Sequence, residues 1–253
     1  MRGHHTWFIA RFGLLSALLL SQLVAAQPAR SRFMMLGEDI VFYIGRIEQK
    51  TVDALIQSIG DRPIQRLVID SAGGTLSDGI RLGQWVKQKG ADVEVKNLCM
   101  SSCANYVFTA ANKKTISDGA LIVWHGSAEQ KNFREEQEKY RLLLDRQSKG
   151  ETLSAEETAY LLSNKTRYEN GEEQRRLQRE FFASIGVDEY LTRLGQEPTP
   201  TGSAWTVDLK TMKAFGVSNV TAPENYGTQA YVDKAFPQSG LRHIPLALTS
   251  NRP

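Results

Sequence analysis

Two serines lie between two cysteines in the middle of the chain, in the segment Cys99-Met-Ser101-Ser102-Cys103. A strand pattern ends here and the pattern of a buried helix begins, so the serines lie at a helix N-terminus. Serine is among the best N-capping residues, and this can be its whole role. A serine on so sharp a turn can instead be a nucleophile, with the N–H groups after it stabilising an oxyanion.

Two other segments offer groups for the same chemistry. The turn Ser71-Ala-Gly73-Gly74 follows a strand pattern, and its glycines leave backbone N–H groups uncovered toward an anion. His125 follows the apolar residues 120–124. A glycine pair or a single histidine is often only structural. However, the carboxyl ends of parallel strands are where α/β sheets place their sites, so we take both as candidates.

The elements that must position these residues alternate along the chain. Residues 40–47, 66–70, 91–97 and 120–124 have strand patterns, and residues 51–59, 78–89 and 101–111 have helical ones. This order predicts right-handed βαβ units, a mostly parallel sheet and an α/β fold.

The chain after residue 128 divides into three parts. Residues 129–194 are charged and helical in pattern, and residues 148–150 and the cap-like segment 152–157 split them into at least two helices. This hairpin either packs on its own domain or serves as an oligomer handle or substrate gate. After a loop at residues 196–202, a helix is predicted over residues 205–216. The tail, residues 223–253, is expected on the surface or partly disordered.

The first 26 residues have the pattern of a secretory signal peptide. Arg2 and Arg11 accompany the uncharged apolar run 12–24, and cleavage is predicted near Ala26. The alternative, a membrane anchor, needs about 20 apolar residues, which this run does not reach. We therefore expect export from the cytoplasm, and the family resemblance given below implies the periplasm as the compartment.

Export places the two cysteines in an oxidising compartment. Cys99 and Cys103 have no histidine or aspartate ligand close by, so a short-loop disulfide is favoured over a metal site. The 253 residues suffice for one or two domains, and a charge of +3 without a basic stripe argues against nucleic acid. We expect no cofactor and no metal.

In combination, these segments resemble the proteolytic subunit of Clp protease and the wider crotonase-like superfamily, especially its exported, Clp-like bacterial branch. That family carries a Gly-Gly turn, then a small-small-Ser elbow, then a histidine about two dozen residues later; here His125 lies 24 residues after Ser101. The exported branch typically has a Cys-x-Ser-x-Cys elbow, which Cys99–Cys103 fits. The resemblance covers roughly residues 40–126 and, more loosely, residues 205–220.

The resemblance implies a fold and a set of roles. The fold would be a repeated ββα spiral formed by residues 27–128 and 195–222, with residues 129–194 as a charged helical insertion. Ser101 would be the nucleophile and His125 its general base. The N–H groups of Gly73, Gly74 and Ser102 would form the oxyanion hole. Ser102 is the alternative nucleophile, but Ser101 places the helix at residues 104–111 in the family's register.

The third member of the family's triad is unknown here. Family members carry an acid before the last helix, whereas residues 198–204 contain none. Glu197 lies just upstream, and Asp208, just downstream, is expected to cap the helix. Three possibilities stay open: a Ser–His dyad, another group that orients the ring, or loss of catalysis.

The resemblance implies an exported serine hydrolase, an ATP-independent Clp-like peptidase whose substrate is a short or unfolded peptide or a small ester or amide. No ATPase partner is expected, because ATP is not available outside the cytoplasm. The family often forms rings or trimers, so a homo-oligomer is consistent with the resemblance. The alternatives are an inactive Clp-like protein for binding or assembly, and acyl-CoA chemistry, which fits the export signal and the Ser–His pair poorly.

Overall fold

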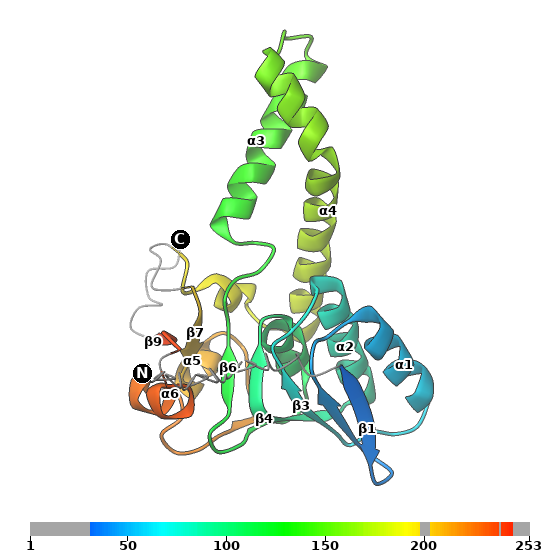
Figure 1. Ribbon diagram of the computed structural model, residues 1–253, viewed down its shortest axis with the longest axis vertical. Coiled ribbons are helices and arrows are strands. Elements are labelled where there is room, and N and C mark those ends of the chain that lie inside the picture. Colours follow the sequence, from blue (N-terminus) through cyan, green and yellow to red (C-terminus); the bar gives the residue numbers. More distant parts are fainter. Residues whose placement is uncertain (1–30, 198–202, 238, 245–253) are drawn as a thin grey trace, which may run out of the picture.

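The computed structural model describes residues 31–197, 203–237 and 239–244. The predicted signal peptide, and most of the loop without an acid, lie outside the described residues. One seven-stranded sheet with its connecting helices forms the body, and a helical hairpin projects from it (Figure 1).

The sheet is mostly parallel, which confirms the predicted α/β class. β1 runs antiparallel to β2, and the other five strand pairs are parallel. The strand order is β1-β2-β3-β4-β5-β8, and β6 also pairs with β4, beyond the stretch that β5 occupies. The strands are β1 (Arg32–Leu36), β2 (Ile40–Ile44), β3 (Arg66–Ser71), β4 (Asp92–Met100), β5 (Lys114–Ile116), β6 (Leu121–Val123) and β8 (Val220–Thr221).

Three helices connect the central strands. They are α1 (Gln49–Ile59), α2 (Leu76–Lys89) and the π-helix η1 (Cys103–Phe108). Thr75 caps α2 by accepting a hydrogen bond from the N–H of Asp78. α2 lies so close to η1 that a Cβ on Gly79 would stand 2.6 Å from the Cβ of Ser102. This contact fixes the start of η1 relative to the rest of the body.

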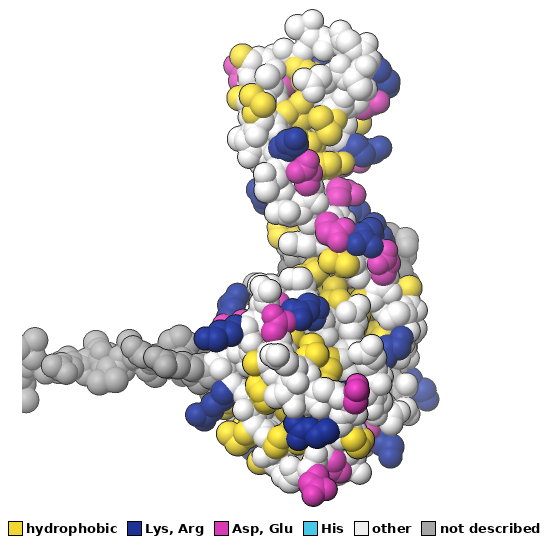
Figure 2. All heavy atoms as spheres, turned by 90° about the vertical axis from the view of Figure 1, so that its right-hand side faces the viewer, with side chains coloured by type: hydrophobic (Ala, Val, Ile, Leu, Met, Phe, Trp, Pro, Cys, Tyr) yellow, Lys and Arg dark blue, Asp and Glu magenta, His cyan; other side chains and the backbone are white. Residues whose placement is uncertain are grey.

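The charged insertion forms the projecting hairpin, as predicted (Figure 1). Its helices are α3 (Lys131–Ser148) and α4 (Ala155–Ile185), and the short 3-10 helix η2 (Glu189–Arg193) follows. The expected cap is confirmed, because Ser154 and Glu157 form a capping box at the start of α4. Hydrophobic side chains are visible among the charges on the hairpin surface (Figure 2). The large exposed ones are Phe133, Leu142, Leu144 and Leu162.

Residues 205–216 correct the prediction of one long helix. Trp205–Val207 forms strand β7, and helix α5 (Leu209–Ala214) begins after Asp208, whose side chain caps it as expected. Trp205 pairs with Trp124 in an antiparallel bridge, and β7 pairs in parallel with β9 (Arg242–Ile244). All three side chains of β7 are buried, so the segment is covered on both faces. Continuous burial of this kind hides the alternation that identifies a strand.

The described part of the tail contains more secondary structure than the prediction of a surface or partly disordered segment suggests. Helix α6 (Gln229–Ala235) and strand β9 pack onto the body, and Tyr231, Val232 and Ile244 are buried. The hydroxyl of Tyr226 accepts a hydrogen bond from the N–H of Ile122 in β6. Within the described ranges, no helix is both long and apolar enough to cross a bilayer.

A buried lysine at the start of β5 leads to a prediction about stability. The Nζ atom of Lys114 donates to the carbonyls of Ala111 (2.8 Å) and Ser218 (3.1 Å), and burial lowers the pKa of Lys114 to about 8. Since the unfolded chain binds this proton up to pH about 10, stability should rise with pH between about 8 and 10. Relative to Lys114→Met, the wild type should gain up to about 3 kcal/mol across this range.

Urea unfolding of both proteins at several pH values measures this difference. Lys113→Met is the matched control. Lys113 is exposed and this variant keeps Lys114, so its stability should depend on pH as that of the wild type does. Parallel pH dependence of the wild type and Lys114→Met would contradict the prediction.

Candidate active site

Ser101 occupies a strained turn between strand and helix. β4 ends at Met100, and Ser101 has a φ of 61°, one of two positive values at non-glycine residues among those described. Serine rarely adopts this conformation, which costs on the order of 1–3 kcal/mol and is found mainly at functional sites. The carbonyl of Ser101 then accepts a hydrogen bond from the N–H of Asn105 (2.8 Å) as the helix begins. A strand–serine–helix elbow of this kind exposes a hydroxyl at the sheet's end.

The strand pairing brings Ser101 and His125 to the same end of the sheet. β4 and β6 are parallel neighbours whose last registered pair is Met100 and Val123. The N–H of Ser101 donates to the carbonyl of Val123 at 3.0 Å. His125 lies two residues beyond Val123, and both Ser101 and His125 are half-buried. The two candidates therefore follow the carboxyl ends of adjacent strands, as the sequence predicted.

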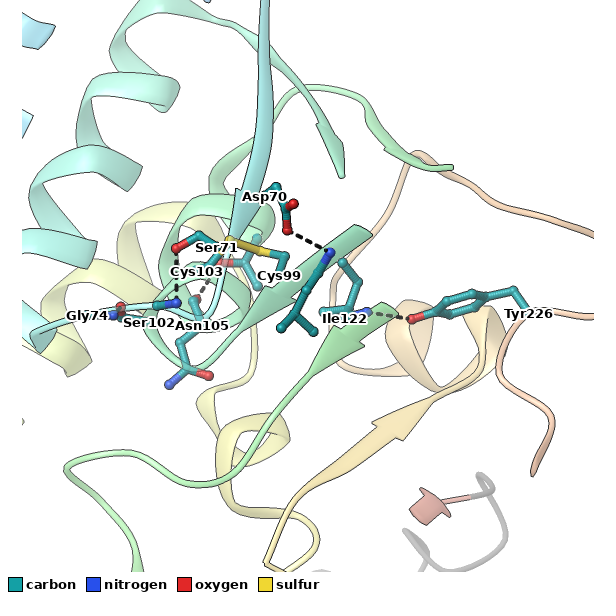
Figure 3. The surroundings of a disulfide bond; sticks show 12 residues. Asp70, Ser71, Gly74, Cys99, Ser102, Cys103, Asn105, Ile122 and Tyr226 are labelled. Carbon is teal, nitrogen blue, oxygen red and sulfur yellow. Dashed lines mark hydrogen bonds between the residues drawn. A yellow bond between two sulfur atoms is a disulfide. The ribbon is translucent and has the colours of Figure 1, made fainter. Parts of the chain in front are cut away.

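A disulfide links the end of strand β4 to the start of helix η1, on either side of Ser101. Cys99 on β4 and Cys103 on η1 are bonded, and both side chains are fully buried (Figure 3). The closed ring contains Ser101, so the bond restrains the path of the backbone on both sides of the serine. The described residues contain no cluster of histidine, cysteine and acidic side chains that could hold a metal ion.

The glycine turn lies directly against the elbow. Gly73 has a φ of 90°, and a Cβ placed on it would stand 2.5 Å from the carbonyl oxygen of Met100 and 2.7 Å from the Cβ of Ser101. Only glycine permits both this conformation and this approach. The predicted neighbourhood of the glycines and the serine pair is thus present.

The two glycine N–H groups are not open, however. The N–H of Gly73 donates to the hydroxyl of Ser71 (3.0 Å), and the N–H of Gly74 donates to the hydroxyl of Ser102 (2.7 Å; Figure 3). Ser102 itself is buried. Its N–H belongs to the first turn of the helix, where N–H groups lack a partner within the helix. Among the described residues, the Ser102 hydroxyl thus has a hydrogen-bond partner and the Ser101 hydroxyl has none.

His125 is near Ser101 in register but is not bonded to it. Neither the ring of His125 nor the hydroxyl of Ser101 forms a hydrogen bond to any residue in the described part of the chain. The backbone around His125 is well fixed: its carbonyl accepts from Nε2 of Gln196 (2.9 Å), and the next carbonyl, that of Gly126, accepts from Nδ2 of Asn105 (3.1 Å). Catalytic hydrogen bonds are often long or absent before substrate binds.

The two nearby acids are engaged elsewhere. Glu197 is buried and makes a bidentate pair with Arg134, at 2.9 and 3.1 Å. Asp208 caps α5, and its other carboxylate oxygen faces Nε2 of His243 at 3.9 Å. Neither carboxylate contacts His125, so the described residues supply no third member of an acid–histidine–serine triad.

No protein-family model matches this chain, and no curated protein matches it.

Two buried amides near the site were missed at the sequence level. Asn105 contacts the backbone beside His125, and Gln178 of α4 accepts from the Tyr106 hydroxyl of η1 at 2.8 Å. Burial raises the pKa of Tyr106, so its hydroxyl stays protonated as a donor. A signal for Asn105 existed, because it interrupts the apolar helical pattern of residues 101–111. Gln178 lies in a densely charged helix and carried no comparable signal.

Proposed function

We propose that this chain is an exported serine hydrolase in which Ser101 is the nucleophile and His125 the general base. The observation that carries the proposal is the positive φ of Ser101 at the end of a central parallel strand, bracketed by a disulfide and faced by Gly73. A strained serine is more than a capping residue needs, because N-caps have ordinary extended backbone conformations.

The proposed reaction is acyl transfer. The hydroxyl oxygen of Ser101 attacks a carbonyl carbon while Nε2 of His125 takes the hydroxyl proton. The proton then passes to the departing amine or alcohol, and water releases the acyl group from Ser101 by the same steps. The N–H of Ser102 faces the developing oxyanion. Rotation of the Ser102 hydroxyl away from Gly74 would add a second donor.

The substrate class follows from the resemblance to exported Clp-like proteins. The proposed finer fold is the repeated ββα spiral of that superfamily, and the proposed compartment is the periplasm. The substrate would be a short or unfolded peptide, or a small ester or amide, hydrolysed without an ATPase partner.

A second function is favoured by two observations. Both glycine N–H groups are occupied by serine hydroxyls, and the described residues offer no acid to His125. An inactive Clp-like protein that only binds a ligand or assembles with a partner would need neither group. The two functions differ in whether Ser101 reacts.

A fluorophosphonate probe tests the difference, because it phosphonylates only an activated serine, whose oxygen displaces fluoride from phosphorus. Peptide mass spectrometry of the labelled protein is expected to find the probe on Ser101. Ser101→Ala should show no label, whereas Ser102→Ala, the matched control, should keep it. If the folded wild type stays unlabelled, the hydrolase proposal fails and the proposal of a non-catalytic binding protein takes its place.

A further inference from the structure

Asn105 joins the turn of the serine to the turn of the histidine. It is the fourth residue after Ser101 and is 3% exposed. Its backbone N–H donates to the carbonyl of Ser101 (2.8 Å), and its side-chain Nδ2 donates to the carbonyl of Gly126 (3.1 Å). Gly126 directly follows His125. Asn105 is thus bonded to both candidate segments, to the serine turn by its backbone and to the histidine turn by its side chain.

The other end of this amide lacks a partner among the described residues. Oδ1 of Asn105 is buried and accepts no hydrogen bond from any of them. The orientation of the amide is settled by Gly126, because a carbonyl can only accept and Nδ2 must therefore face it. A buried acceptor without a donor is destabilising, and native structures keep few of them. This acceptor therefore calls for a donor.

The ring of His125 is a candidate donor, because His125 adjoins the residue whose carbonyl Asn105 binds. It makes no hydrogen bond within the described ranges, and it belongs to the residue before the one that Asn105 holds. The charged neighbours do not compete for it. Glu129 is paired with Arg175 (3.1 Å) and Arg179 (2.6 Å), and Glu197 is paired with Arg134.

We propose that Oδ1 of Asn105 accepts the Nδ1–H of His125 and thereby points Nε2 toward Ser101. Asn105 is then a positioning residue, a neutral amide in the place of the acid. It fixes the tautomer of the ring, because the nitrogen that donates to Asn105 carries the proton and the other nitrogen stays a base. The role in catalysis rests on the hydrolase proposed above, but the hydrogen bond itself can be tested without activity.

The test is the titration of His125 by NMR in the full chain. The sequence has four histidines, and the signal of His125 is the one lost in His125→Gln. In Asn105→Asp, a carboxylate replaces the amide oxygen next to the ring. An opposite charge this close favours the imidazolium, so the pKa of His125 should rise by about one pH unit or more.

Asn112→Asp makes the same chemical change at an exposed residue after η1 and should leave the titration of His125 unchanged. In the wild type, nitrogen chemical shifts should place the proton of the neutral ring on Nδ1. Asn105→Leu should lose this preference, and thermal unfolding checks that each variant is folded. If the role of Asn105 is purely structural, its replacement should change the stability of the protein but neither the pKa nor the tautomer of His125.

Two outcomes overturn the proposal: a pKa of His125 that is the same in the wild type and Asn105→Asp, or a wild-type ring with its proton on Nε2. If the titration shifts as expected but the fluorophosphonate leaves the wild type unlabelled, the hydrolase fails and the positioning bond stands. If Ser101 is labelled but the titration does not shift, only the role of Asn105 fails.

Discussion

Fluorophosphonate labelling of Ser101 is expected to slow by about a hundredfold to ten-thousandfold when His125 is replaced by glutamine. A serine hydroxyl is a weak nucleophile until a base takes its proton. His125 is the proposed base, and the β4–β6 register places it at the same end of the sheet as Ser101. Glutamine keeps a side chain of similar length and hydrogen-bonding capacity but cannot accept a proton at neutral pH. The second-order rate of labelling, followed by intact-mass spectrometry, measures the effect.

The structure supplies a matched control for this experiment. His243 lies on β9 and faces Asp208, so His243→Gln should label at the wild-type rate. Equal labelling of the wild type and His125→Gln would show that another group activates the serine. The dyad would then be wrong even if Ser101 carries the label.

Replacing Gly74 by alanine is expected to destabilise the protein by about 3 kcal/mol or more, or to prevent folding. A Cβ at this position would stand 1.7 Å from the carbonyl oxygen of Ile47 and 2.6 Å from its carbonyl carbon. Gly74 forms a parallel bridge with Ile47, so neither backbone can withdraw without breaking that pairing. Urea denaturation measures the free energy of unfolding, and circular dichroism shows whether the variant folds.

Gly90→Ala separates this clash from the general cost of replacing a glycine. Gly90 ends α2 with a φ of 61°, and a Cβ there would meet nothing within 4 Å. The left-handed conformation alone should cost about 1–2 kcal/mol. If Gly74→Ala loses no more stability than Gly90→Ala, the prediction that the close contact between Gly74 and Ile47 excludes a side chain is contradicted.

The parallel core could be predicted because local patterns and chain order agree there. Residues 67–69 are a short apolar run of the kind that a strand buried on both faces requires. Thr75 and Gly90 mark the ends of the helix that follows. Once the strands are parallel and adjacent, Ser101 and His125 must follow the same edge of the sheet. The disulfide followed from the spacing of two cysteines in a chain with an export pattern.

Other features depended on contacts between distant segments. Burial of Trp205 comes from its pairing with Trp124, and the order of the tail comes from β9 pairing with β7, neither of which leaves a local pattern. The occupied N–H of Gly74 depends on the rotamer of Ser102, 28 residues away. The positive φ of Ser101 likewise arises from the junction of β4 and η1, and no residue type announces it.

The buried amide of Gln178 has a mechanical consequence. Its side chain is fully buried, and its oxygen accepts from the Tyr106 hydroxyl (2.8 Å) and from the Ala128 N–H (3.3 Å). One side chain at the root of the hairpin is thus tied both to the helix that starts at the serine and to the loop after the histidine. Any tilt of the hairpin that displaces the lower part of α4 must stretch or break these bonds. A force applied to the outer end of the hairpin would therefore act, through the hydrogen bonds of Gln178, on the segments that carry both residues of the proposed dyad.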